Sequence, residues 1–247
     1  MLSKRTKAVA RSRRSGRPGL ERLETRAVPA VFNISPSADA ASLRTTIAAA
    51  LVNEDASDTI NLGTGIYRFG STNNGGTPSA GQIRIDIPAG LTLTIVGDGA
   101  SSTSIDAAKL SRVFEIVGQG SVVFRNLSIV KGKTFDGGSL GSARALGGGL
   151  LIEGSSVTLD HVTVSSNVAT GAVAPGGLVI PGAGGRDAAG GGLYLASGSV
   201  TLVSANFSVN SAEAGSGIKG ANASADGTTP GVKGKAGLDG ITGADGL

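Results

Sequence analysis

The sequence predicts an all-β solenoid, a stack of coils made of short parallel strands, with one amphipathic helix at its N-terminal end. Three observations predict this fold. The stretch "GGGLLIEGSSVTLDHVTVSSN", which begins at Gly147, returns 43 residues later as "GGGLYLASGSVTLVSANFSVN". Short runs of alternating apolar and polar residues are separated by Gly, Asn and Pro. The 247 residues include 41 Gly but only 3 % aromatics, so the core must be mainly aliphatic.

Residues 1–31 form a basic segment that differs from the rest of the chain, and we expect it to be disordered. Residues 1–30 carry nine Lys or Arg against two Glu, a net charge of +7, whereas residues 31–247 carry 13 against 16, a net charge of −3. We do not expect nucleic-acid binding, because the segment has no aromatic residue on which a base could stack. The sequence also has no apolar run near the roughly 20 residues of a membrane span, so none is predicted.

The end of this segment, "LERLETRAVPA", resembles the N-terminal sorting motif of a class of large bacterial surface proteins. That motif reads Leu-Glu-x-Leu-Glu-x-Arg-x-x-Pro-Ala. The resemblance implies an exported protein of the cell surface or the extracellular space. The alternative is a short charged helix over residues 20–26 that ends before the proline. The matching residues are Leu20, Glu21, Leu23, Glu24, Arg26, Pro29 and Ala30.

Residues 37–58 contain the predicted helix. Ser42 is the expected N-cap, and the Ala-rich stretch that follows places its apolar side chains on one face. A solenoid exposes an apolar end at its first coil, and an amphipathic helix can cover that end. We therefore expect a capping helix, whose buried face consists of Leu43, Ile47, Ala50 and Leu51.

Residues 59–214 are predicted to form the coils, because three copies of one pattern align from Val113, Gly149 and Gly192. A single copy cannot bury its apolar face, whereas stacked copies share one core. The aligned apolar sets are Phe114, Leu150 and Leu193; Ile116, Ile152 and Leu195; Val122, Val157 and Val200; and Phe124, Leu159 and Leu202. The alignment also predicts an outward row of Arg125, Asp160 and Val203, with a surface ion pair between the first two, and a following turn row of Asn126, His161 and Ser204.

From about Ser42 to Ala214 the chain resembles the right-handed parallel β-helix proteins of the pectin-lyase-like superfamily, and more closely the repeat-bearing bacterial surface proteins within it. The resemblance implies the fold but not one activity, because this fold includes lyases, hydrolases, adhesins and passive stalks. For a lyase, it implies acidic sugars bound through Ca²⁺ by Asp ligands, with an Arg base. Under that alternative the catalytic candidates are Arg125, Asp160 and His161.

We expect no catalytic residue, metal or cofactor otherwise. Calcium needs about six to eight convergent oxygen ligands, whereas only Glu153 and Asp160 fall in the same coil. His161 aligns with Asn126 and Ser204, so we interpret it as a polar turn residue. The chain also has no Cys, which excludes a disulfide or thiol nucleophile.

Glycine marks two further features. The clusters at 147–149 and 190–192 open strands, so we expect them to return the chain from a loop into a tight coil, where positive φ is required. Residues 215–247 have Gly at every third position from 231, as in collagen, but no Pro between those glycines. We interpret them as a flexible Gly-rich segment, either truncated or inserted before a further coil.

Together these patterns predict a non-catalytic structural or adhesin-like protein of the cell surface that presents Gly-rich loops. Its expected partner is a polysaccharide or protein of the cell envelope or the extracellular space. The alternative is a polysaccharide lyase or glycoside hydrolase of the pectin-lyase-like superfamily. The oligomeric state is left open.

Overall fold

The computed structural model describes residues 29–35, 40–53, 55–70, 81–141, 143–173 and 184–217. The sorting-like motif up to Arg26, and the Gly-rich segment beyond Gly217, lie outside these residues. Every strand pair in the described chain is parallel, as the solenoid prediction requires.

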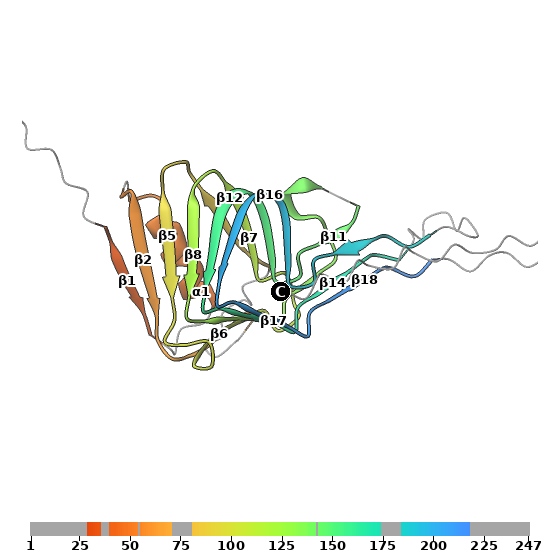
Figure 1. Ribbon diagram of the computed structural model, residues 1–247, viewed down its shortest axis with the longest axis horizontal. Coiled ribbons are helices and arrows are strands. Elements are labelled where there is room, and N and C mark those ends of the chain that lie inside the picture. Colours follow the sequence, from red (N-terminus) through yellow and green to blue (C-terminus); the bar gives the residue numbers. More distant parts are fainter. Residues whose placement is uncertain are drawn as a thin grey trace, which may run out of the picture.

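The strands form two large sheets that enclose the core (Figure 1). The first sheet contains β1 (Val31–Ile34), β2 (Ser57–Leu62), β4 (Ile83–Ile87), β5 (Thr92–Val96), β7 (Phe114–Gly118), β8 (Ser121–Arg125), β12 (Leu150–Asp160) and β16 (Leu193–Val203). The second contains β3 (Gly65–Arg68), β6 (Thr103–Asp106), β9 (Ser128–Val130), β13 (Thr163–Ser165) and β17 (Asn206–Ser208). Successive strands along either sheet come from successive turns of the chain, so the sheets stack the coils.

The predicted alignment of the repeats is confirmed by the strand register. Leu150 pairs with Phe114 on one side and with Leu193 on the other. Leu159 pairs in the same way with Phe124 and Leu202. The other two aligned sets also pair without a shift. Because side chains alternate between the faces of a strand, matched register keeps every apolar set on the inner face.

The core between the sheets is mainly aliphatic, as the composition predicts. Its buried side chains come from the inner positions of nearly every coil, from Ile60 in β2 to Val164 in β13. Two aromatic rings meet within it, where the centroids of Phe114 and Phe124 are 4.8 Å apart. The stack is therefore held together by side chains that each coil contributes to a shared interior.

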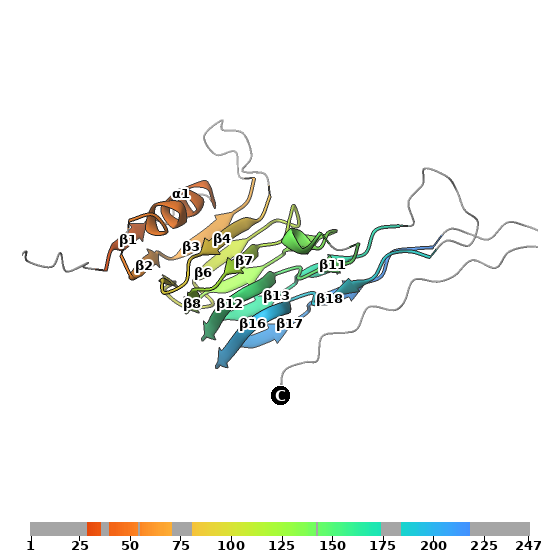
Figure 2. The same ribbon diagram turned by 90° about the horizontal axis from the view of Figure 1, so that it is seen from above.

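The helix α1 (Ala40–Ala50) lies against β1, β2 and β3 at the N-terminal end of the stack (Figure 2). Its buried face includes the predicted Leu43, Ile47 and Ala50, together with Ala40, whereas Leu51 is only partly buried beyond the end of the helix. The predicted N-cap is wrong, because the helix already includes Ala40 and Ser42 lies in its first turn. No helix in the described part of the chain is long and apolar enough to cross a membrane.

The loop insertions form a second, smaller stack beside the main one. One sheet contains β10 (Lys133–Thr134), β14 (Val168–Thr170) and β18 (Ser211–Glu213), and another contains β11 (Ala145–Leu146) and β15 (Ala188–Ala189). Small side chains fill the space between them: Ala145, Ala169, Ala188 and Ala212. Figures 1 and 2 show these strands leaving the main sheets on one side. The described ends of the Ala-rich loops thus continue the stacking of the coils.

An asparagine ladder joins the last two coils where they turn into these loops. The Asn167 side chain is fully buried. Its Oδ1 accepts from the Gly132 backbone N–H at 2.7 Å, and its Nδ2 donates to the Asn210 Oδ1 at 3.0 Å. The Asn210 Nδ2 in turn donates to the Val164 carbonyl at 2.9 Å. Asn167 and Asn210 lie 43 residues apart, so the ladder follows the repeat.

The glycine clusters have the role that the sequence predicts for them. Gly147 and Gly190 have φ values of 64° and 63°. At Gly148, an added Cβ would lie 2.4 Å from the carbonyl oxygens of both Gly191 and Val168. The chain re-enters the coil here with backbone packed against backbone.

We expect Gly148→Ala to destabilise the stack strongly, because neither carbonyl can move without breaking the ladder between coils. Urea unfolding followed by circular dichroism checks this expectation. Gly184→Ala is the matched control, because an added Cβ there meets nothing within 4 Å. Equal unfolding midpoints for the two variants would contradict the close backbone packing.

Candidate functional site

The three catalytic candidates Arg125, Asp160 and His161 lie together on the outer surface, where β8 and β12 end. The Arg125 Nε donates to the Asp160 Oδ2 at 2.7 Å, which confirms the predicted ion pair between adjacent coils. The other oxygen of the same carboxylate lies 2.6 Å from the His161 Nδ1. The hydrogen bonds from Arg125 and then His161 lower the pKa of Asp160 below its usual value. Asp160 is therefore an ionised acceptor held by two neighbours.

The backbone at His161 explains its position in the repeat. Asn126, His161 and Ser204 all have left-handed backbone conformations, with φ of 53°, 53° and 50°. The His161 N–H donates to the Val203 carbonyl at 2.8 Å, and the Asn126 N–H donates to the Asp160 carbonyl at 3.0 Å. Each aligned residue makes the same tight turn between the two large sheets, as the interpretation of His161 as a turn residue requires.

A shallow hollow adjoins these turns on the side of the second large sheet. Hydroxyl, amide and imidazole groups lie along it, and it is open and shallow, unlike the enclosed cavities of most small-molecule sites. Its lining residues are Ala100, Ser101, Asn126, Ser128, His161, Thr163 and Ser204.

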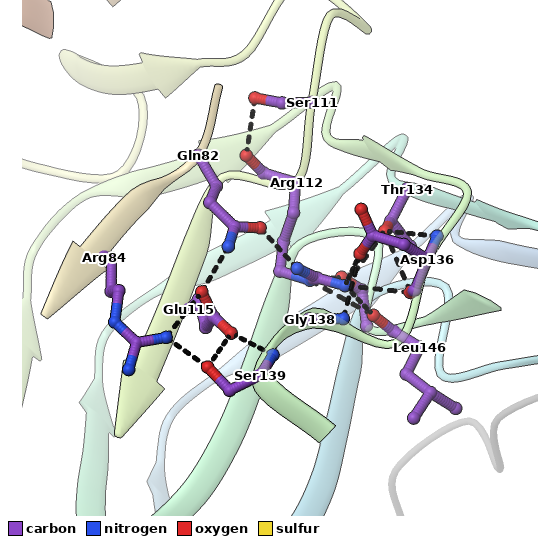
Figure 3. A network of polar contacts seen from close by, with 11 residues as sticks. Gln82, Arg84, Ser111, Arg112, Glu115, Thr134, Asp136, Gly138, Ser139 and Leu146 are labelled. Carbon is purple, nitrogen blue, oxygen red and sulfur yellow. Dashed lines mark hydrogen bonds and ion pairs between the residues drawn. The ribbon is translucent and has the colours of Figure 1, made fainter. Parts of the chain in front are cut away.

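Arg112 lies at the centre of a buried polar network that the sequence does not reveal (Figure 3). Its side chain is 1 % exposed, and the Nε donates to the Gly147 carbonyl at 2.8 Å. One terminal nitrogen donates to the Leu146 carbonyl at 2.7 Å and to the Thr134 Oγ1 at 2.9 Å. The same nitrogen forms an ion pair with Asp136 at 3.1 Å. Arg112 thus fastens both ends of the loop between β10 and β11 to the main stack.

Glu115 is the acidic partner within this network, and it is 2 % exposed. One carboxylate oxygen accepts from the backbone N–H and the Oγ of Ser139, both at 2.6 Å. The other contacts the Gln82 amide and forms an ion pair with Arg84 at 3.2 Å. Burial alone would raise the pKa of Glu115, but the hydrogen bonds from Ser139 and the charge of Arg84 outweigh it and lower the pKa. The carboxylate is ionised, and the loop that carries the 3₁₀ helix η1 (Gly138–Leu140) covers it.

Glu153 and Glu115 together resemble a catalytic acid–base pair. Burial, followed by the negative charge of Glu115, raises the pKa of Glu153. Two carboxyl groups with opposite pKa shifts are the usual arrangement of a general acid and a base. Here, however, Ser139, Gln82 and Arg84 already occupy both oxygens of Glu115. A substrate could not reach that carboxylate unless the loop opened, so the pair fits a structural role.

A second buried carboxylate, Asp106 at the end of β6, joins its own coil to the coils before and after it. It is 1 % exposed and accepts from the Lys131 Nζ and an Arg68 nitrogen, both at 3.0 Å. The Ala108 N–H donates to it at 2.8 Å, where the chain turns with φ of 52°. Burial opposes ionisation, but the Lys131 hydrogen bond and the other contacts prevail and lower the pKa of Asp106. Two cationic side chains and one backbone N–H bind this carboxylate, so Asp106 acts as an anchor for the turn.

The described residues contain no group of three or more His, Cys, Asp or Glu side chains that could hold a metal ion. Comparisons of the chain with protein-family models, with curated proteins and with solved structures found no match.

Three carboxylates whose pKa values are lowered, of which Asp106 and Glu115 are buried, predict an acid-labile fold. The pKa values of Asp106, Glu115 and Asp136 are lowered by folding. Their stabilising contribution is fully present above the pKa of an unfolded carboxyl group, about 4, and is lost as the pH falls through the lower folded values. Glu153 has the opposite sign, since its raised pKa favours folding at low pH.

We therefore expect the urea midpoint to fall steeply below about pH 4, because the three carboxylates with lowered pKa values outweigh the opposite effect of Glu153. In Asp106→Asn the slope of this fall should be smaller, and the midpoint at pH 7 should be lower. Midpoints measured from pH 2 to pH 7 check both statements. A wild-type midpoint that does not change over this range would show that these carboxylates are not stabilised by folding.

Proposed function

We propose that this protein is a non-catalytic, exported component of the cell surface, with a structural or adhesin-like role. The proposal rests on the contacts of three buried charged side chains. Arg112, Glu115 and Asp106 are bonded to loop and turn atoms, and their side chains are almost fully covered. Such charges hold the loops in place on the surface. They leave no position at which a substrate could bind them.

We infer that the coils form a right-handed parallel β-helix with α1 as its cap. Parallel strands in one sheet are joined by right-handed connections in about 98 % of cases. The four buried side chains of α1 belong to the same hydrophobic cluster as the first coils. The likeness to the pectin-lyase-like superfamily, and to its surface proteins in particular, belongs to this proposal.

Export is inferred from the sorting-like motif between Leu20 and Ala30. Pro29 and Ala30 precede β1 directly, and the Ala30 carbonyl accepts from the Thr59 N–H at 2.9 Å. The partner would be a polysaccharide or protein of the cell envelope or the extracellular space, bound without a cofactor. A reporter fused behind residues 1–31 should reach the cell surface of a bacterium that carries this motif in its own proteins. The same fusion with Arg26→Ala and Leu23→Ala should remain inside, and surface display of both fusions would refute the role of the motif.

The alternative is a polysaccharide lyase or glycoside hydrolase, with Ca²⁺ as the cofactor of the lyase. It is favoured by the exposed contacts of Asp160 with Arg125 and His161 beside the polar hollow. Incubation of the protein with acidic and neutral polysaccharides, with and without Ca²⁺, separates the two proposals. We expect no new reducing ends and no unsaturated products. Turnover that disappears in both Asp160→Asn and His161→Gln, with the fold retained, would establish the enzyme instead.

A further inference from the structure

The outer side of strands β2, β5, β8, β12 and β16 carries two columns of hydroxyl groups. On the first four strands these residues face outward, because they alternate with buried neighbours, and on β16 they are the register partners of the outward residues of β12. Nine of the ten positions are Ser or Thr, and we call this surface the hydroxyl grid. The first column consists of Ser57, Thr92, Ser121, Ser156 and Ser199, and the second of Thr59, Thr94, Val123, Thr158 and Thr201.

The spacing of the grid is regular in both directions. Residues of one column are direct register partners on adjacent strands, about 4.8 Å apart. The two columns are separated by two residues along each strand, about 6.7 Å. Figure 1 shows these strands side by side and pointing the same way. The register does not shift within the grid across the five strands, so the outward groups repeat as a two-dimensional lattice.

The hydroxyl groups of the grid are available to an external partner. All ten residues are partly or largely exposed. Among the described residues, one side-chain hydrogen bond involves the grid, from the Ser199 Oγ to the Ser156 Oγ at 3.1 Å. A hydroxyl group can donate and accept, so each Ser or Thr of the grid can adopt either role toward a neighbouring water.

The charge of this face restricts the class of partner. No position of the grid is charged. The next outward row contains Arg125 and Asp160, which neutralise each other in an ion pair. The grid therefore offers no charge complementarity to an ion or a charged polymer, whereas an uncharged hydrogen-bonding surface is complementary to it.

Because single hydrogen bonds are weak, the partner of the grid must be rigid and repetitive. One neutral hydrogen bond contributes only about 0.5–1.5 kcal/mol net, so useful affinity needs many bonds formed together. The branched Thr side chains have restricted χ1 angles and stand on strands fixed by the core, so little entropy is lost on binding. A flexible soluble ligand would lose conformational entropy at every strand that it contacts, whereas a crystal surface has none to lose.

We propose that the hydroxyl grid binds the surface of ice, a rigid and uncharged lattice of hydrogen-bonding groups. Sugar sites normally combine apolar or aromatic walls with a few convergent polar groups, and the ten grid positions contain no aromatic residue. The methyl and hydroxyl groups of Thr instead offer an even surface on which ordered water can continue its own network. This proposal does not depend on the cell-surface role, and either can fail without the other.

Three measurements on the full chain test the proposal: ice recrystallisation, the gap between freezing and melting points, and partition into a growing ice front. We expect smaller ice grains than with an unrelated protein of equal size. The double variant Thr94→Lys with Thr158→Lys should need about ten times more protein or more, the factor expected for losing two contacts. Thr45→Lys with Thr46→Lys on α1 is the matched control and should behave as wild type. Circular dichroism and urea midpoints verify that all variants fold.

A second double variant separates shape from hydrogen bonding. Thr94→Val with Thr158→Val retains the shape of the grid but removes two hydroxyls, and it should lose part of the effect. Wild-type protein that leaves ice grains as large as the unrelated protein does would overturn the proposal. Retention on an insoluble neutral polysaccharide, without an effect on ice and lost in the lysine variant, would also overturn it and assign the grid to a glycan.

Discussion

Replacing Arg112 with Met is expected to lower the free energy of unfolding by about 3–5 kcal/mol, the usual result of removing one member of a buried ionic network. The variant leaves the carbonyls of Leu146 and Gly147 without their donor. It also leaves Asp136 without its cation. Equilibrium urea unfolding at pH 7, followed by far-UV circular dichroism, measures the loss.

Two further variants show whether this loss comes from the buried guanidinium. Arg112→Lys should be intermediate, because an ammonium group cannot copy the planar fork that reaches several acceptors. Arg125→Met removes an arginine whose ion pair lies on the surface, and it should change the midpoint little. A midpoint for Arg112→Met equal to that of Arg125→Met would mean that the network does not hold the loop.

Replacing Asn167 with Leu is expected to destabilise the fold by about 2–4 kcal/mol, because each buried partner left without a hydrogen bond costs about 1–3 kcal/mol. The Gly132 N–H and the Ile129 carbonyl would both lose a partner inside the stack. Hydrogen exchange followed by NMR should show faster exchange of the Gly132 amide in particular. Asn210→Leu is the matched control on the last coil, and it should cost less because Asn210 is only partly buried. Unchanged protection of the Gly132 amide in Asn167→Leu would contradict the ladder.

The register of the coils could be predicted because the repeats carry it directly. An apolar period of two must keep one face inward, and aligned copies can share a core only if equivalent residues stack. The alignment of Arg125 with Asp160 therefore predicts their ion pair correctly. The pattern of the hydroxyl grid is also present in the sequence. A Ser or Thr is followed two residues later by a second one in "SDT", in "TLT" and in two copies of "SVT".

The network around Arg112 could not be predicted in the same way. Its partners Thr134 and Asp136 lie in a loop that does not repeat, 22 and 24 residues further along the chain. Nothing in a single sequence shows where such a loop folds back. The start of α1 was predicted too late, because Ser42 is a good N-cap residue by type, whereas the helix already includes the buried Ala40.

Disulfide cross-linking measures most directly whether the coils stack in this register, the claim on which the network, the ladder and the hydroxyl grid all depend. The chain has no Cys, so an introduced pair reports only on its own geometry. Val123 and Thr158 are register partners on β8 and β12. Val123→Cys with Thr158→Cys should form an intramolecular disulfide under mild oxidation, because partners about 4.8 Å apart lie within the range of a disulfide.

The matched control is Val123→Cys with Ser156→Cys, on the same outer face but displaced by two residues. That diagonal, about 8 Å from the spacings between strands and between residues, is too long for an unstrained disulfide. Rapid oxidation of the first pair, with the second remaining reduced, is the predicted result. Equal oxidation of both pairs, or faster oxidation of the displaced pair, would contradict the stacked coils.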